Sequence, residues 1–266
     1  MFLTDVEHTL TETFLNQGYV IRPAADMAAL DWIREQFFLL SKEALGIESN
    51  VKAEQFLNTI HERVPINELN DFRLKMIRGI NSDDKFRLLY YQIAKPYLDV
   101  LVGNELAMQL QVNLSIQLPG DRSSLLPLHA DTWSGDSPFE VVVWIPLVRC
   151  YGTKAMYILS PEASDELSER FSRGQISSSE EMYAEVSDKA EWLEIAYGDV
   201  LLFNQALPHG NRVNIEGETR WSMNCRFKGV FTPYGDKKLG EFFEPITLRA
   251  ASLIGMGYRH PGMVGI

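Results

Sequence analysis

The residues with the clearest capacity for chemistry are His129 and Asp131, which flank Ala130 in the chain. On an extended strand, residues two apart project from the same face, so the imidazole and the carboxylate would lie side by side. Such a pair supplies two of the three ligands of a two-histidine, one-carboxylate facial triad, which holds Fe(II) and leaves open positions for other ligands. A surface turn with a capping Asp is the competing interpretation, because His-x-Asp also occurs by chance.

A third candidate ligand, His209, follows an apolar strand pattern that runs from Gly198 to Phe203. Farther along the chain, polar and apolar residues alternate from Arg220, so that Arg220 and Arg226 share the polar face of a strand that is apolar behind. Two guanidinium groups in such a place are costly unless they meet anions. Either a bound carboxylate ligand or acidic side chains across the sheet would satisfy them, and the sequence leaves both interpretations open.

The elements that must position these residues change character near residue 107. Before that point, amphipathic helical patterns predict helices within residues 5–16, 25–46, 70–78 and 83–101, and a short strand at 18–21. Beyond it, the patterns predict many short strands, at 109–118, 141–147, 154–161, 192–195, 198–203 and 220–231. Residues 162–189 are acidic and rich in serine, which indicates a partly helical surface insertion.

We therefore expect one domain over residues 1–266, mainly β with an α wrapper. Residues 1–106 would form a mainly helical wrapper, 107–231 a sandwich or barrel core, and 232–266 a C-terminal cover or interface. In a wrapped sandwich, the polar face of a strand can line an interior cavity while its apolar face packs under helices. Gln117 lies on the polar face of the strand predicted at 109–118, and is a candidate for the cavity.

Composition narrows the partners and the compartment. The formal charge of −11 argues against nucleic acid or an anionic membrane as the main partner, so a small-molecule substrate is expected. The apolar run from Val141 to Val148 is far shorter than the roughly 20 residues that a membrane helix needs. Cys150 and Cys225 form no Cys-x-x-Cys motif, and no signal-peptide pattern opens the chain, which favours a cytoplasmic location. The sequence leaves the oligomeric state open.

Taken together, these motifs resemble the Fe(II)/2-oxoglutarate-dependent dioxygenases of the phytanoyl-CoA dioxygenase-like family. The resemblance covers roughly residues 107–231 and rests on His129-Ala130-Asp131, Trp144-Ile145-Pro146-Leu147, Gly198-Asp199 with Phe203, His209-Gly210, and Arg220 eleven residues after the second histidine. The chain departs from the family pattern at residues 159–162, where Leu-Ser-Pro-Glu stands in place of a Pro-Gly-Ser-His segment.

The resemblance implies a double-stranded β-helix (jelly roll) flanked by N-terminal helices. It also implies that Fe(II) is held by His129, Asp131 and His209, and that 2-oxoglutarate chelates the iron and places its far carboxylate on Arg220. Trp144 and Asn211 would be further co-substrate contacts, and Gln117 is a further candidate chosen from the polar strand face. With O2, such enzymes convert 2-oxoglutarate to succinate and CO2 and oxidise an unactivated C–H. The carboxylate of Asp131 favours hydroxylation, since related halogenases have a small residue there.

The substrate is the least determined part of this prediction. Arg226 could bind a second anion, such as a phosphate or a carboxylate, and the other candidates for the cavity rim are Trp133, Asp136, Arg149, Lys154 and Asn224. A faint similarity to a subgroup associated with bacterial surface-carbohydrate biosynthesis favours a sugar or nucleotide-sugar. Two alternatives stay open: a non-catalytic jelly-roll protein that binds a metal or small molecule, and a cupin-type isomerase, which would not need Arg220.

Overall fold

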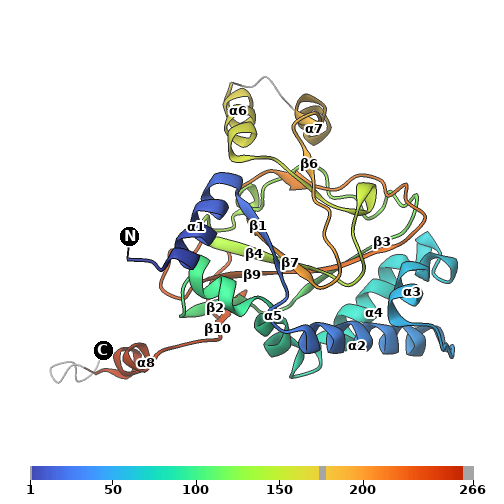
Figure 1. The fold of residues 1–266 in the computed structure, drawn as a ribbon, viewed down its shortest axis with the longest axis horizontal. Helices are drawn as coiled ribbons and strands as arrows, with labels where there is room; N and C mark the ends of the chain where they lie inside the picture. The colour runs from blue at the N-terminus through green and yellow to red at the C-terminus, as the bar shows by residue number, and fades with distance from the viewer. Residues whose placement is uncertain (1, 174–177, 260–266) are drawn as a thin grey trace.

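Two antiparallel sheets form the centre of the fold in a computed structural model that describes residues 2–173 and 178–259 (Figure 1). The strands are, in chain order, β1 (Tyr19–Pro23), β2 (Leu106–Gln109), β3 (Asn113–Gln117), β4 (Glu140–Pro146), β5 (Tyr157–Ile158), β6 (Glu191–Trp192), β7 (Asp199–Asn204), β8 (His209–Gly210), β9 (Arg220–Gly229) and β10 (Phe243–Pro245). The larger sheet has the order β1-β7-β4-β9-β2-β10, with β3 also paired to β9, and the smaller has the order β6-β5-β8.

Helices cover the outer side of the larger sheet. The α-helices of the described ranges, whether or not they cover this sheet, are α1 (Asp5–Gln17), α2 (Met27–Leu45), α3 (Ala53–Asn58), α4 (Leu69–Asn81), α5 (Phe86–Leu101), α6 (Pro161–Ser172), α7 (Ser179–Val186) and α8 (Ala250–Gly257). The apolar stripes of α2, α4 and α5 share one core with β3, β4 and β9. The two sheets do not close into a barrel within the described part of the chain. The predicted jelly roll with N-terminal helices is confirmed.

Trp221 shows why β9 turns its polar face inward. Its indole is fully buried, with ring centroids 6.0 Å from Phe37 of α2 and 6.0 Å from Phe72 of α4. Its Nε1–H donates to the carbonyl of Leu57 at 2.9 Å. Because the apolar side chains of β9 fill this helix–sheet core, the alternating polar side chains, Arg220 first among them, must point to the other side.

Two strand predictions were too long. The pattern at 109–118 is two strands, β2 and β3, separated at residues 110–112, and they pair with different parts of β9. The pattern at 154–161 contains only β5, because residues Gly152–Lys154 form a 3-10 helix and Ser160 already caps α6 by accepting from the N–H of Ala163. A helix cap and a strand end look alike in sequence when each is a Ser-Pro step.

The strands predicted at 192–195 and 198–203 lie in different sheets, since β6 belongs to the smaller sheet and β7 to the larger. The turn between them carries the chain from one sheet to the other. The helix predicted at 83–101 begins slightly later, because α5 starts at Phe86 with Lys85 at the cap position.

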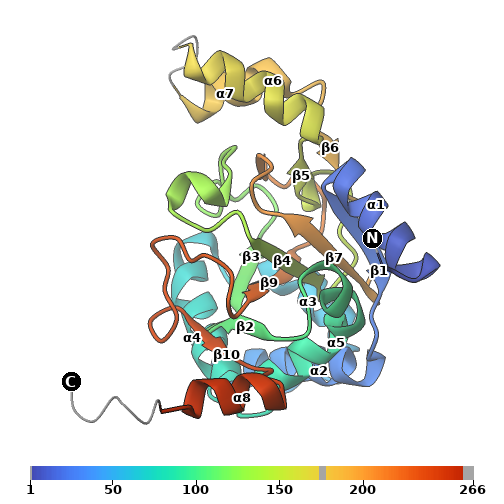
Figure 2. The same ribbon diagram turned by 90° about the vertical axis from the view of Figure 1, so that its left-hand side faces the viewer.

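The remaining segments lie at the periphery. Helices α6 and α7 stand beyond the smaller sheet, away from α2 and α5 (Figure 2). After β9, the chain adds β10 to the edge of the larger sheet beside β2 and continues into α8 (Figure 1). The larger sheet therefore draws strands from all three predicted segments, 1–106, 107–231 and 232–266, and residues 260–266 lie outside the described residues.

A membrane-crossing helix would have to be longer and more apolar than any helix found in the described ranges.

Candidate functional site

A cavity of about 450 Å³ opens on the polar face of β9. Arg220, Ser222, Asn224 and Arg226 line it from this strand, as the alternation in the sequence indicates. The opposite residues of the same strand lie in the helix–sheet core. Val142 and Trp144 of β4, with Met156 and Phe203, give the cavity a buried apolar wall.

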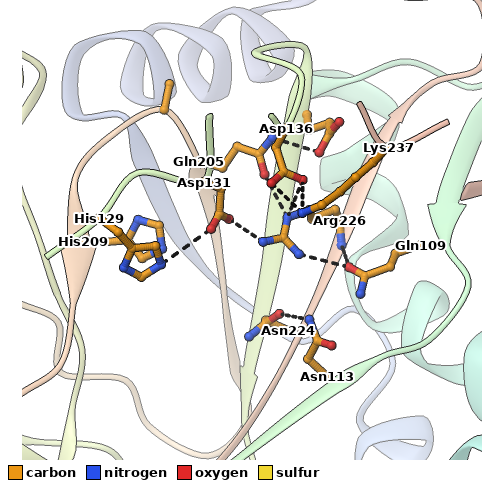
Figure 3. Close-up of polar contacts among 12 residues, drawn as sticks. Gln109, Asn113, His129, Asp131, Asp136, Gln205, His209, Asn224, Arg226 and Lys237 are labelled. Carbon is orange, nitrogen blue, oxygen red and sulfur yellow. Dashed lines mark hydrogen bonds and ion pairs between the residues drawn. The ribbon is translucent and has the colours of Figure 1, made fainter. Parts of the chain in front are cut away.

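Three candidate metal ligands meet at this cavity. One ligand atom each from His129, Asp131 and His209 can be chosen so that all lie within 4.8 Å of one another. His129 Nε2 is 3.6 Å from Asp131 Oδ1, and the two imidazole centroids are 4.5 Å apart (Figure 3). The three side chains are thus close enough to bind one ion, as a facial triad requires.

The backbone explains how residues so distant in sequence meet. His129 and His209 form an antiparallel bridge, in which each N–H donates to the carbonyl of the other at 3.0 and 2.8 Å. Ala130 is extended, so His129 and Asp131 face the same side as predicted. Asp131 itself lies at the start of a 3-10 helix rather than on a strand, and its N–H donates to Gln205 O at 3.0 Å.

The hydrogen bonds of both imidazoles favour metal binding. Nδ1 of His129 lies 2.8 Å from the carbonyl of Pro127, and Nδ1 of His209 lies 2.9 Å from that of Leu207. A carbonyl accepts only, so each Nδ1 carries the proton and donates it. The lone pair of each Nε2 is therefore free for an ion, which is the orientation found in metal-ligating histidines.

The charges at the triad are arranged for a cation. Burial lowers the pKa of His209 to about 4, and the His129 ring acts in the same direction, so His209 is neutral at physiological pH. Burial opposes protonation of His129, but the Asp131 carboxylate and the Pro127 carbonyl raise its pKa above the ordinary value. Burial alone would raise the pKa of Asp131, yet contact with His129, His209 and Arg226 holds it well below its usual range.

Arg226 holds the carboxylate ligand in place. Its Nη2 lies 2.8 Å from Asp131 Oδ2, and its Nε donates to Gln205 Oε1 at 3.0 Å and lies 3.4 Å from Asp136 Oδ1 (Figure 3). Lys237, from the C-terminal segment, donates to both oxygens of Asp136 at 2.6 and 2.7 Å. The guanidinium is therefore shared between two carboxylates, which is the acidic-side-chain interpretation that the sequence left open beside a bound second anion.

Arg220 is in the opposite situation. Its side chain is buried, Nη2 donates to Ser115 Oγ at 3.0 Å and Nη1 to Ala155 O at 3.3 Å, and Nε has no hydrogen-bond partner among the described residues. No carboxylate in the described ranges lies within ion-pair distance of it. Burial lowers the pKa of Arg220 to about 10, and the guanidinium still carries its charge at neutral pH.

Other predicted co-substrate contacts divide into two groups. Trp144 lines the cavity, whereas Gln117 does not, and the amide of Gln117 donates to the carbonyl of Arg212 at 2.6 Å. Asn211 lines the cavity but also fixes its rim, since its Oδ1 accepts from Leu126 N at 2.7 Å and its Nδ2 lies 3.3 Å from Ser124 O. The side chain of Asn211 therefore holds the rim of the cavity by hydrogen bonds to the backbone of residues 124 and 126.

The predicted rim residues are mostly elsewhere. Asn224 lines the cavity and accepts a hydrogen bond from Asn113 Nδ2 at 2.9 Å. Trp133 is exposed outside the cavity lining and stacks on Phe171 of α6, with centroids 6.2 Å apart. Arg149 forms an exposed pair with Glu194, and the buried ammonium of Lys154 donates to Asn58 and Glu218.

Several cavity residues were missed in the sequence, and three of them show why. Ser222 could have been found, because it lies two residues after Arg220 on the same strand face. Arg73 of α4 reaches the cavity from a helix predicted only as wrapper, and no local pattern marks it. Leu126 belongs to an irregular segment whose position depends on Asn211, far away in the chain.

Metal binding at the triad should weaken as the pH falls. A metal ion needs the neutral form of His129, whose pKa is raised above its ordinary value by the Asp131 carboxylate and the Pro127 carbonyl, so Co(II) affinity should fall about tenfold for each pH unit below that pKa. His209, with a pKa of about 4, stays neutral over the same range, which predicts a slope of one proton per ion. Visible-absorption titrations with Co(II) between about pH 5 and 8 measure this pH dependence of the Co(II) affinity. A slope of zero or two protons would contradict this assignment.

Replacing Arg226 by Met should weaken metal binding about 10- to 100-fold, because Asp131 would lose the group that fixes its second oxygen. The d–d spectrum of bound Co(II) should also change, since a freed carboxylate can turn to offer both oxygens. Arg149→Met, which removes an exposed arginine paired with Glu194, is the matched control and should leave both readouts unaltered. Equal Co(II) affinity in the two variants would show that Arg226 does not support the ligand.

Comparison with known proteins identifies the fold. No protein-family model matches the chain, and no curated protein matches it. Among solved structures, the nickel complex of the non-haem monooxygenase ThoJ is 15% identical, with 90% of this chain and 84% of that chain covered and a TM-score of 0.57. HygX from Streptomyces hygroscopicus, with nickel and 2-oxoglutarate bound, is 15% identical, with 89% and 90% covered and a TM-score of 0.52.

A third similar structure is SnoK, a non-haem α-ketoglutarate-dependent carbocyclase from nogalamycin biosynthesis. It is 17% identical, with 92% of this chain and 97% of that chain covered and a TM-score of 0.50. The resemblance inferred from the sequence motifs is thereby confirmed at the level of the fold, which this chain shares with non-haem, 2-oxoglutarate-dependent enzymes.

Proposed function

We propose that this protein is an Fe(II)/2-oxoglutarate-dependent oxygenase that hydroxylates an unactivated C–H bond of a small polar metabolite. One observation carries the proposal: the cavity that holds the triad also holds Arg220, a buried guanidinium with no carboxylate partner among the described residues. A buried charge without a partner is costly, so such a site is selected for a ligand of opposite charge.

The unpartnered polar atoms fit the co-substrate. Nε of Arg220 and Oγ of Ser222 are both buried and lack hydrogen-bond partners in the described ranges, and both residues line the cavity. 2-Oxoglutarate is a dicarboxylate, and the oxygens of its far carboxylate would accept from the guanidinium and the hydroxyl. The Arg220-x-Ser222 spacing places the two donors on one strand face.

The triad residues would hold the iron. His129 and His209 would bind through Nε2, and Asp131 through the oxygen that Arg226 leaves unpaired. Bound iron and 2-oxoglutarate would together activate O2 for attack on a C–H bond. The rest of the task belongs to the protein, which must orient the substrate and exclude water.

The apolar wall serves water exclusion. Val142, Trp144, Met156 and Phe203 are buried on one side of the cavity, and the ring of Phe203 lies edge-on to His209 with centroids 4.9 Å apart. Trp144 adds a co-substrate contact in this proposal. The polar edge of the cavity, which includes Asn224, would face a hydroxylated metabolite such as a sugar.

The related folds support the proposal. HygX was solved with nickel and 2-oxoglutarate, and ThoJ is a non-haem monooxygenase, so the shared fold accommodates both the metal and the co-substrate. Asp131 supplies a full facial triad, which favours hydroxylation. The two cysteines are buried and unpaired, which suits a reducing cytoplasm.

The direct test is succinate formation from 2-oxoglutarate with Fe(II), ascorbate and O2. The wild-type protein should form succinate slowly without substrate and faster with the correct one, whereas His129→Ala should lose both Co(II) binding and succinate formation. Normal turnover by His129→Ala would reject the metal assignment. Tight binding of metal and 2-oxoglutarate without any succinate, with or without substrate, would instead favour a non-catalytic binding protein.

Arg220→Met should separate binding from stability. The variant should bind 2-oxoglutarate about 10- to 100-fold more weakly, because a charge-assisted contact is lost. Its folding stability without ligand should be equal or higher, since burial lowers the pKa of Arg220 to about 10 and the charged form therefore opposes folding at neutral pH. Calorimetry and thermal unfolding, each with and without 2-oxoglutarate, measure the two effects. A large loss of stability with full 2-oxoglutarate affinity would mean that Arg220 is structural.

A further inference from the structure

The charges that line the cavity are unusual for this protein. The chain has a formal charge of −11, yet the described lining contains the three arginines Arg73, Arg220 and Arg226 and a single carboxylate, that of Asp131. Asp131 is itself a proposed metal ligand. An acidic protein whose cavity carries more guanidinium groups than carboxylates is suited to anionic molecules.

Two of the three arginines already have roles. Arg226 is shared between Asp131 and Asp136, at 2.8 and 3.4 Å. Arg220 is buried where the proposed function places the far carboxylate of 2-oxoglutarate. The third arginine, Arg73, has no role so far. Its one hydrogen bond in the described structure runs from Nη2 to the neutral side chain of Asn70, at 2.8 Å. Its charge has no acidic partner among the described residues.

Exposure places Arg73 at the open end of the cavity. Val142, Trp144 and Phe203 on the inner wall are buried, whereas Asn113 and Leu126 are exposed and Arg73 is half-buried. Helix α4, which carries Arg73, lies beside β3, the strand of Asn113 (Figure 2). Arg73 therefore lies where the lining of the cavity meets solvent.

Neutral hydrogen-bond donors accompany Arg73. Asn224 accepts from Asn113 through Oδ1, an arrangement that leaves the amide nitrogen of Asn224 without a partner in the described ranges (Figure 3). The hydroxyl of Ser124 is also on the lining. A guanidinium that has no carboxylate partner of its own, in a cavity also lined by amide and hydroxyl donors, is suited to binding an anion.

We propose that the open end of the cavity is an anion subsite, in which Arg73 binds a phosphate or carboxylate group of the substrate. This inference rests on the proposed function for the identity of the reaction and deepens it by defining the substrate class. The anionic group would be held at Arg73 while the remainder of the molecule extends inward, so that a C–H bond away from the charge is presented to the triad. A neutral or cationic metabolite would gain nothing from this contact.

Binding experiments test the subsite without requiring turnover. The probes are inorganic phosphate, glucose 1-phosphate, glucuronate, glucose and glucosamine, titrated into the full chain by calorimetry. All titrations use the Arg220→Met background as well as the wild type, because Arg220 would otherwise attract the same anions. Glucose 1-phosphate and glucuronate distinguish a phosphate from a carboxylate, and glucose and glucosamine represent the neutral and cationic classes.

At least one anionic probe should bind, and Arg73→Gln should weaken it about 10- to 100-fold. Arg73→Lys should retain part of the affinity, because it keeps the charge but not the planar fork. Lys75→Gln is the matched control, since it removes one positive charge from the exposed side of the same helix and should change nothing. Absence of binding by every anion, equal anion binding by Arg73→Gln, or a preference for glucose or glucosamine would overturn the proposal.

The outcomes for the two proposals are separable. Arg73-dependent anion binding without succinate formation would support the anion subsite and reject the proposed oxygenase activity. Succinate formation with anion binding that does not depend on Arg73 would support the oxygenase activity and reject the subsite.

Discussion

Compensation of buried positive charge organises this cavity. Strand β9 must present Arg220 and Arg226 to the interior, because the alternate residues of the same strand, such as Trp221, are fixed in the helix–sheet core. The protein neutralises Arg226 internally with two carboxylates and leaves Arg220 with neutral partners only. Arg226 thereby holds Asp131, whereas Arg220 keeps the uncompensated charge on which the proposed 2-oxoglutarate site rests.

The proposed metal ligands are held by backbone pairing and by charge. The antiparallel bridge between His129 and His209 fixes two ligands through main-chain hydrogen bonds, which do not depend on side-chain identity. The carboxylate of Asp131 depends instead on a side-chain network that runs through Arg226 and Asp136. The three ligands therefore differ in how easily a distant substitution could displace them.

Much of this arrangement was accessible from the sequence, because strand alternation is a local signal. Strand alternation predicted which face of β9 is polar. The motif resemblance predicted that His129, Asp131 and His209 lie close together, as they do in the structure. The partners of the cavity arginines could not be assigned from the sequence. Whether Arg226 meets a substrate or Asp136 depends on tertiary packing, and so does the approach of Arg73 from a helix whose pattern marks only its buried side.

Lys237 comes late in the sequence, yet it belongs to the charge network that surrounds the proposed metal ligands. All three proposed ligands and both cavity arginines of β9 have been synthesised by residue 229, yet Asp136 shares its charge between Arg226 and an ammonium that comes later. The segment that brings Lys237 also docks on the loop after Asp131, where Asp236 N–H donates to Gly135 O at 2.9 Å. During translation, the three proposed ligands are therefore synthesised before Lys237. A chain that ends after β9 would contain every proposed ligand but would lack the ion pair between Lys237 and Asp136.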